Sequence, residues 1–452
     1  MSRLRFAGVV AIAALVVGGA ATALVLSGDD LARMSVERNR VEVTVRVWDA
    51  SVAKGYEKAF DAFERTNPEI DVKVDVVPFA SYFDTLDESL DSGTGDDIFW
   101  LNASGMGSHV QNGDLLDIGQ VLGDTRRADW SPSVVDQFTT DGKLWGVPQL
   151  SDGGIALYYN KALVQAAGID PATLDDLTWA PGGGDGDTLL PVLKELTVDA
   201  NGNRASSAAF DGTPVQYGYN AGQDLQAIML NYLGSNGAAF ENADGTGFAF
   251  DTEEARAAYQ YVVDLVNKEH VAPPASATNA DGDFSRNQFV AGKMALFQSG
   301  LYSLPTIAQD ASFDWGVVRM PAGPEGRVSV SNGIVASGNA HTKHVEATAK
   351  VLAWLGSADG ARYIGADGAA VPAITAAQQA YYDHWEKKGV DVSPFFDVID
   401  DSPTIDAPTA VYGLARPAFA DTFNQMFAGQ LPVAEALDRA DEQATAALSD
   451  RH

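Results

Sequence analysis

Strand and helix patterns alternate near the start of the chain, and this alternation most narrows the folds open to it. Residues 41–48 alternate β-branched and charged side chains, as a half-buried strand does. Residues 56–65 then place apolar side chains at helical spacing. A second strand, a second helix and a third strand follow at residues 70–77, 82–90 and 97–102. Strands separated by helices predict the α/β class with a mostly parallel sheet.

Polar and aromatic side chains come directly after these strands. Trp48 and Asp49 follow the first strand, and Asn102 and Ser104 follow the third. Ligands of open α/β sheets bind beyond the carboxyl ends of the strands. We therefore expect these four side chains at a binding site.

A second constraint is the stretch at residues 142–160, with the sequence GKLWGVPQLSDGGIALYYN. It opens with an alternating, partly aromatic strand pattern at residues 143–147, and Pro148 is expected to stop this strand, because proline has no N–H to give to a central ladder. The polar turn SDGG and the apolar strand IALYY follow. A strand, a polar turn and a second strand in mid-chain fit a passage between two lobes beside a ligand cleft. We expect Gln149, Ser151 and Asp152 to face that cleft.

The composition argues against several classes of protein. At 452 residues the chain is too long for one core, which predicts about two or three folding units. A net charge of −31 without a basic stripe argues against nucleic acid as a partner, because the phosphate backbone would be repelled. The absence of cysteine excludes disulfides and thiolate metal sites, and the six histidines form no HExxH pair. We expect no cofactor and no metal site.

Two loops resemble ligand-binding motifs without completing them. The Gly-rich residues 179–187 lack the Gly-Lys-Ser/Thr ending of a phosphate loop and predict a flexible insertion. Residues 199–203, with the sequence DANGN, match half of a calcium loop, but the Glu that completes such a loop is absent in register. A plain turn is the favoured prediction there.

The amino terminus has the pattern of an export signal. Two arginines precede an apolar run at residues 6–26, which is also long enough to span a bilayer as an uncleaved anchor. A small-x-small site, ATA, is available for cleavage, and LSG resembles the start of a lipobox with Asp29 in place of the cysteine. Residues 1–28 are therefore expected to be a signal peptide or membrane anchor and residues 29–40 a tether. Each alternative places the folded part outside the cytoplasm.

The predicted site residues combine aromatic rings with short polar groups, a mix that suits a sugar. Aromatic faces cover the apolar face of a sugar ring, while Asp, Asn and Gln side chains bond to its hydroxyls. No GxSxG motif accompanies a suitable histidine. Carboxylates are abundant, so a secreted glycoside hydrolase that uses a carboxylate pair stays open as an alternative.

A series of motifs spans residues 41–448. The motifs are ERTNPEIDVKVDVVPF, GTGDDIFWLNA, LLDI, GKLWGVPQ with ALYYNKAL, QYGYN, NYLGSNGAAF, FVAGKMALFQSGLYSLP, HTKHVEATAKVLAWLGSADGARY and AGQLPVAEAL. In this order they resemble the extracellular solute-binding proteins of the carbohydrate type, the maltose-binding-protein-like receptor components of bacterial ABC importers. Each motif alone is weak evidence, whereas the ordered series is specific.

The resemblance implies a periplasmic-binding-protein fold, in which two α/β lobes are joined by hinge-crossing strands and enclose a ligand cleft. The division expected from it is residues 41–150 and 332–385 in lobe 1, and residues 151–331 and 386–452 in lobe 2. Residues 415–427 and 433–448 are expected to close the chain as helices. In this family sugar binds between the lobes, which close by a hinge.

The family positions that touch ligand can be carried over to this chain. With the strand-end residues, the predicted ligand-binding set is Trp48, Asp49, Asn102, Ser104, Gln149, Ser151, Asp152, Tyr219, Gln223, Tyr302, Asn332, Gly333 and Arg416. Tyr302 stands where related proteins usually carry tryptophan after Gly-Pro. Arg416 is nominated only as the cation that a phosphate-bearing ligand would need, with a surface ion pair as its alternative role.

The function implied by the resemblance is that of a non-enzymatic receptor. It would capture a mono- or oligosaccharide and deliver it to the transmembrane permease subunits of an ABC importer, acting as a monomer at the outer face of the cell membrane or as a secreted protein. The same fold with another solute, such as a polyol, glycerol phosphate or a peptide, is one alternative. The secreted glycoside hydrolase is the other.

Overall fold

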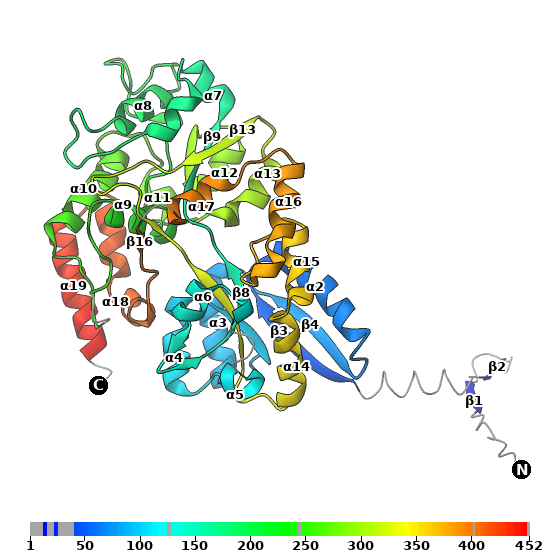
Figure 1. Cartoon of the computed structure of the whole chain (residues 1–452). Coiled ribbons are helices and arrows are strands. Elements are labelled where there is room, and N and C mark those ends of the chain that lie inside the picture. The colour runs from blue at the N-terminus through cyan, green and yellow to red at the C-terminus, as the bar shows by residue number, and fades with distance from the viewer. Residues whose placement is uncertain are drawn as a thin grey trace, which may run out of the picture.

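The computed structural model describes residues 12–15, 22–25, 40–123, 128–242, 246–400 and 403–449. Figure 1 shows two lobes, one above the other in the view. We call the lower lobe, which contains β3 (Val41–Val47) and α2 (Ala50–Glu64), lobe 1. The upper lobe, which contains β9 (Ala156–Asn160) and α10 (Glu253–Asn267), is lobe 2. Two lobes of mixed helix and strand confirm the predicted fold class.

The predicted export segment and tether lie outside the described residues, except for two short strands and Arg40. The strands β1 (Ile12–Leu15) and β2 (Thr22–Val25) pair antiparallel. In the part of the chain that the structure describes, no helix is both long enough and apolar enough to cross a membrane.

Lobe 1 is built on a five-stranded sheet with the order β4-β3-β5-β15-β8. Its further strands are β4 (Ile70–Val76), β5 (Ile98–Leu101), β8 (Val147–Ser151) and β15 (Gly333–Gly338). β3 pairs parallel with β4 and with β5, whereas β15 pairs antiparallel with β5 and with β8. The carboxyl ends of β3, β4 and β5 therefore meet at one edge of the sheet, the edge that faces lobe 2 (Figure 1).

The helices of lobe 1 cover its sheet. They are α2, α3 (Phe79–Asp91), α4 (Ala103–Asn112), α5 (Ile118–Leu122), α6 (Pro132–Gln137), α14 (Val345–Leu355) and α15 (Ala358–Ala366), with the small hairpin β6 (Thr139–Thr140) and β7 (Lys143–Leu144). The predicted helical spacing explains α2, because Tyr56, Phe60 and Phe63 all lie on its buried face.

Lobe 2 contains a three-stranded antiparallel sheet with the order β12-β9-β13. Its other strands are β10 (Val198–Asp199), β11 (Pro214–Gln216), β12 (Leu296–Ser299), β13 (Trp315–Arg319), β14 (Ser329–Val330) and β16 (Thr404–Ile405). Helices before β14 are α7 (Lys161–Ala166), η2 (Pro171–Asp176), α8 (Leu189–Leu196), η3 (Leu225–Met229), α9 (Leu230–Ser235), α10, α11 (Ala275–Thr278), α12 (Phe284–Val290), η4 (Leu301–Ser303) and α13 (Leu304–Asp310). After α15, η5 (Thr375–Ala377) and α16 (Gln379–Lys387) pack against α15 of lobe 1. The helices α17 (Ser393–Asp400), α18 (Ala410–Phe427) and α19 (Val433–Ser449) belong to lobe 2.

Each lobe has its own hydrophobic core, and each core is assembled from separate segments. The core of lobe 1 draws on residues 43–150 and 334–377, and that of lobe 2 on residues 155–330 and 398–444. A third cluster, which includes Tyr158 and Trp385, joins β9 and β12 to α16 and α17. Two cores divided by a chain that crosses between them allow the lobes to move as separate bodies.

The passages between the lobes are short. Residues 152–155 lead from β8 in lobe 1 to β9 in lobe 2, and residues 331–332 lead back from β14 to β15. Gly154 is required in the first passage by close packing, because a Cβ atom there would lie 2.4 Å from Cγ2 of Val398. A strand, a turn and a second strand are thus present, but the prediction that Pro148 stops the first strand is wrong. Pro148 lies within β8, and β8 is an edge strand of its sheet, where proline is tolerated.

Candidate ligand-binding site

An aromatic surface covers the edge of lobe 1 that faces lobe 2. The ring of Trp48, directly after β3, lies 4.9 Å from the rings of Tyr82 and Trp100, centroid to centroid, and 5.6 Å from that of Phe79. Trp48 is half-buried by these rings, whereas Phe79 is 56% exposed. This surface offers apolar ring faces to a ligand in the cleft.

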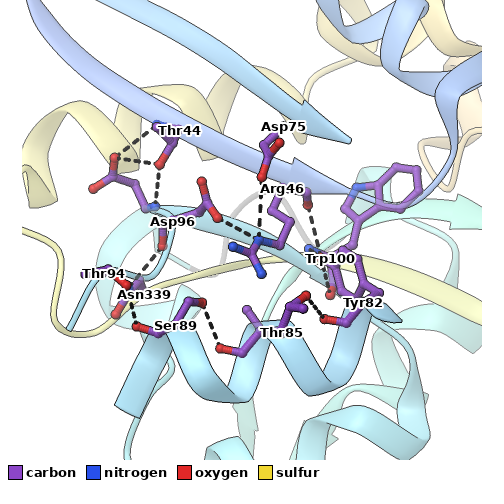
Figure 2. A network of polar contacts seen from close by, with 12 residues as sticks. Thr44, Arg46, Asp75, Tyr82, Thr85, Ser89, Thr94, Asp96, Trp100 and Asn339 are labelled. Atoms are coloured by element: carbon purple, nitrogen blue, oxygen red, sulfur yellow. Dashed lines mark hydrogen bonds and ion pairs between the residues drawn. The ribbon is translucent and has the colours of Figure 1, made fainter. Parts of the chain in front are cut away.

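A polar network around Arg46, Tyr82 and Trp100 holds the backbone near this surface, as Figure 2 shows. The Tyr82 hydroxyl accepts a hydrogen bond from the backbone N–H of Trp100 at 2.9 Å and lies 3.1 Å from the carbonyl oxygen of Arg46. The Arg46 guanidinium, in turn, is 2.7 Å from the carboxylate of Asp96. Because these bonds tie β3, β5 and α3 together, they fix the position of the aromatic surface.

Asp49 and Asn102 begin the two helices that start at this edge. Oδ1 of Asp49 accepts hydrogen bonds from the N–H groups of Ser51 and Val52, and Asn102 Oδ1 accepts one from the N–H of Gly105. Such caps satisfy N–H groups that have no partner within the helix. Ser104 adds a hydroxyl bond of 3.1 Å to Asn102 Oδ1. Each cap uses one side-chain oxygen.

Asp152 lies where the first passage leaves lobe 1. Burial raises the pKa of Asp152 to about 7; a hydrogen bond with Gln226 opposes this rise, and the negative charge of Asp49 adds to it. These interactions bring together a residue of lobe 1, a residue of the crossing and a residue of lobe 2. Ser151, next to it, donates its N–H to the carbonyl of Val371 at 3.0 Å.

Lobe 2 contributes Tyr302 and Asp224 to the same region. Tyr302 is 37% exposed, and a Cβ atom on Gly300 would lie 2.4 Å from its ring, so glycine makes room for the ring. Burial raises the pKa of the Tyr302 phenol, and the negative charges of Asp224 and Asp152 raise it further. Burial also raises the pKa of Asp224, against hydrogen bonds from the N–H groups of Ala227 and Gln226. The charges of two carboxylates therefore act on the Tyr302 phenol.

The first turns of α18 complete the site from lobe 2. Burial raises the pKa of the Tyr412 phenol, the neighbouring Arg416 lowers it, and the charge of Asp224 raises it again. Next in the chain, Gly413 lies against α4 of lobe 1, because a Cβ atom there would be 2.6 Å from the carbonyl oxygen of Ser104. The charges of Arg416 and Asp224 both act on Tyr412, and Gly413 places this turn where the two lobes touch.

Two of the predicted residues lie inside the lobe cores instead of facing the cleft. Gln149 is fully buried in lobe 1, where its amide oxygen accepts a hydrogen bond from the Tyr56 hydroxyl at 2.5 Å. Tyr219 is fully buried in lobe 2 and donates to Oε1 of Gln298 at 2.6 Å. Both side chains are therefore used by the fold.

A cavity of about 680 Å³ lies between the lobes beside the second passage. Its walls are α4 and α6 of lobe 1, residues 331–333 of the passage, and residues 404–409 before α18. Asn332 and Gly333 belong to this wall. Gly333 donates its N–H to Gln137 at 2.8 Å. In the described part of the chain, Oδ1 of Asn332 and Oε1 of Gln223 are buried without a hydrogen-bond partner.

Four residues outside the predicted set belong to the site by their contacts: Phe79, Asp224, Gln226 and Tyr412. One of them carried a usable sequence signal. Asp224 directly precedes η3, at the cap position where Asp is favoured. The other three are placed by contacts with distant segments.

Residues 49–362 match the sequence profile of the family described as bacterial extracellular solute-binding protein. The chain belongs to this family. It is 50% identical to M. tuberculosis UspC, whose crystal structure superposes with a TM-score of 0.72 and matches 90% of this chain and 100% of that one. It is 27% identical over 303 residues to a lactose-binding protein of Rhizobium radiobacter, covering 64% of each chain.

A further structural similarity concerns the fold alone. The ABC substrate-binding protein Lmo0181 of Listeria monocytogenes, solved in complex with cycloalternan, is 18% identical with a TM-score of 0.76 over 91% of this chain and 99% of that one. The resemblance drawn from the ordered motifs is thereby confirmed at the level of the family and the fold.

Proposed function

We propose that the protein is an extracytoplasmic receptor that captures a carbohydrate between its lobes and delivers it to an ABC-type permease. The single observation that carries this proposal is the position of Asp152 between Asp49 of lobe 1 and Gln226 of lobe 2. Polar groups from both lobes and from the crossing converge there. Such a site is complete only when the lobes are close together.

The side chains around Asp152 provide the two kinds of contact that a sugar needs. Trp48 and Phe79 from lobe 1 and Tyr302 from lobe 2 offer ring faces to its C–H surfaces. Asp49, Asp152 and the amide of Gln226 accept from or donate to its hydroxyls. Closure excludes water, which strengthens these polar contacts.

The relatives support carbohydrate as the ligand class, since one is named a lactose-binding protein and another was solved with cycloalternan. The family description supports export and a location outside the cytoplasm. We infer that the partner is the transmembrane part of an ABC importer, that the receptor works as a monomer, and that it catalyses no reaction.

A thermal-shift screen of the purified protein with mono- and oligosaccharides tests the ligand class. A ligand that binds only the folded state raises the unfolding temperature. At a ligand concentration of a hundred times the Kd, it stabilises the folded state by about 2.7 kcal/mol. We expect at least one sugar to raise it and calorimetry to give a matching Kd. A rise with glycerol phosphate or a peptide but with no sugar would overturn the carbohydrate assignment. Release of shorter sugars from an incubated oligosaccharide would identify a hydrolase.

A further inference from the structure

The first turn of α18 is held by a residue outside the ligand site. Thr409 caps this helix with its own hydroxyl, which accepts from the N–H of Val411 at 3.2 Å. Glu241 provides the other acceptors for this turn. Its two carboxylate oxygens accept hydrogen bonds from the N–H of Thr409 at 3.1 and 3.0 Å. One of these oxygens also accepts a hydrogen bond from the N–H of Tyr412 at 3.1 Å. A carboxylate at this end of a helix also meets a favourable dipole.

Glu241 differs from the other carboxylate caps described above because it is distant in sequence. Asp49 caps a helix that starts at the next residue, whereas Glu241 and Tyr412 are 171 positions apart. Phe240, which precedes Glu241, packs against the ring of Tyr412 with centroids 5.5 Å apart. Two consecutive residues of lobe 2 thus hold the backbone and the side chain of one turn.

That turn is the part of α18 that meets the cleft and lobe 1. Thr409, at the start of the turn, lines the cavity between the lobes, and Gly413 lies against the carbonyl of Ser104. A shift of the turn would therefore move the cavity wall and the contact between the lobes together. Asp170 offers a comparison, because it caps η2, which packs against α7 and β13 within lobe 2.

We propose that Glu241 is a positioning residue of the ligand site. It holds the first turn of α18 where Thr409 lines the cavity and Gly413 meets α4. Its effect on ligand affinity rests on the proposed function, but its effect on the turn and on the separation of the lobes does not.

The test uses hydrogen exchange and spin-label distances, and neither needs a ligand. Glu241→Ala, Glu241→Gln and the control Asp170→Ala are compared with the unmodified chain. Because the chain has no cysteine, labels can be attached to single cysteines introduced at the exposed positions Glu57 in lobe 1 and Gln165 in lobe 2. Electron-spin distance measurements between the labels then report how far apart the lobes are.

Loss of a helix cap commonly shifts a local equilibrium by about tenfold. We expect amides 409–412 to exchange about tenfold faster in Glu241→Ala and the distance distribution to move toward larger separations. Glutamine keeps one acceptor oxygen, so Glu241→Gln should restore most of both signals, and Asp170→Ala should change neither. Unchanged exchange and distances in Glu241→Ala, or equal effects of alanine and glutamine, would overturn the proposal.

If Glu241→Ala does not fold, Glu241→Gln carries the test with an expected change of about threefold in exchange. Unchanged exchange in that variant would then count against the proposal. A sugar screen without any hit would remove the proposed function and leave this test valid, so the two failures are distinguishable.

Discussion

The backbone N–H of Asp152 donates to the carbonyl oxygen of Asn332 at 3.0 Å, which joins the two passages where they leave lobe 1. Ser331 adds a hydroxyl bond of 3.1 Å to the carbonyl of Asp152. Two crossing segments bonded to each other move together when the lobes move. The most strongly perturbed carboxylate of the candidate site therefore sits on the hinge itself.

Replacing Asp152 with alanine or asparagine is expected to weaken sugar binding without unfolding the protein. A hydrogen bond to a charged group contributes about 1.5–3 kcal/mol, so the Kd should rise about 10- to 100-fold. Calorimetry at pH 8, where the carboxylate is ionised, measures the effect, and circular dichroism checks the fold. An unchanged Kd in both variants would remove Asp152 from the site.

The same carboxylate should make the empty protein less stable as the pH rises. Its pKa is about 7 in the folded state and about 3.9 in an unfolded chain, so the folded state holds the proton more tightly. The stability this adds is fully present below about pH 4 and is lost progressively up to about pH 7. The contribution of Asp152 to the free energy of unfolding falls by at most about 1.4 kcal/mol per pH unit. The fall is smaller here because the side chain keeps some contact with solvent.

Urea unfolding at pH 5, 6, 7 and 8 checks this prediction by comparing the wild-type chain with Asp152→Asn. The difference between the two isolates Asp152 from the other titrating groups. We expect the variant to gain stability relative to the wild type as the pH rises. Parallel curves for the two proteins would contradict the assigned pKa shift.

The alternating strands and helices of lobe 1 were predictable because their signals are local. The β-branched alternation before Trp48 and the helical spacing at residues 56–65 lie within the elements they define. The orientation of Gln149 was not predictable in the same way. It lies in β8, where Val147, Pro148, Gln149 and Leu150 are all buried, so no alternation marks an outward side.

The start of α18 shows what sequence patterns miss. The pattern predicts a helix from residue 415, whereas the helix begins at Ala410. Gly413 and Pro417 both disfavour a helix interior, so helix propensity does not predict the first turn. Glu241 accepts hydrogen bonds that stabilise this turn, and a local sequence pattern cannot predict a partner so distant in the sequence.

Tyr302 should contribute its ring more than its hydroxyl. Tyr302→Ala removes an exposed ring face, and we expect the Kd for the best sugar to rise about tenfold or more. Tyr302→Phe keeps the face and should stay within about threefold of the wild type. Because the side chain is 37% exposed, thermal unfolding should change little in either variant. Equal losses in both variants would instead assign the contact to the hydroxyl.

Asp199 should matter for stability and not for binding. Its carboxylate accepts hydrogen bonds from the N–H groups of Asn201 and Asn203 at 2.9 and 2.8 Å and from that of Asp211 at 3.2 Å. These bonds support the turn predicted at residues 199–203. Burial opposes ionisation of Asp199, but hydrogen bonds from Asn203, Asn201 and Asp211 lower its pKa overall.

A lowered pKa means that the stability from Asp199 is present above its unfolded value and is lost as the pH falls through the folded value. Asp199→Ala should therefore lower the unfolding temperature at pH 7, with a smaller difference from the wild type at pH 3. The sugar Kd should not change, because the turn lies apart from the site residues. A higher Kd with an unchanged unfolding temperature would show that the loop acts on sugar binding instead.

Gly413→Ala tests the contact between the lobes. Alanine is favoured over glycine in a helix by about 1 kcal/mol, so the variant should not lower the stability of lobe 2. The added Cβ atom, however, would lie 2.6 Å from the carbonyl oxygen of Ser104, and a backbone atom cannot rotate away. The lobes should therefore fail to reach the arrangement seen here, and the sugar Kd should rise about tenfold. Thermal unfolding without ligand provides the control, since a fall in the unfolding temperature would attribute the loss of binding to damage within α18. An unchanged Kd would show that ligand binds without the contact between α4 and α18.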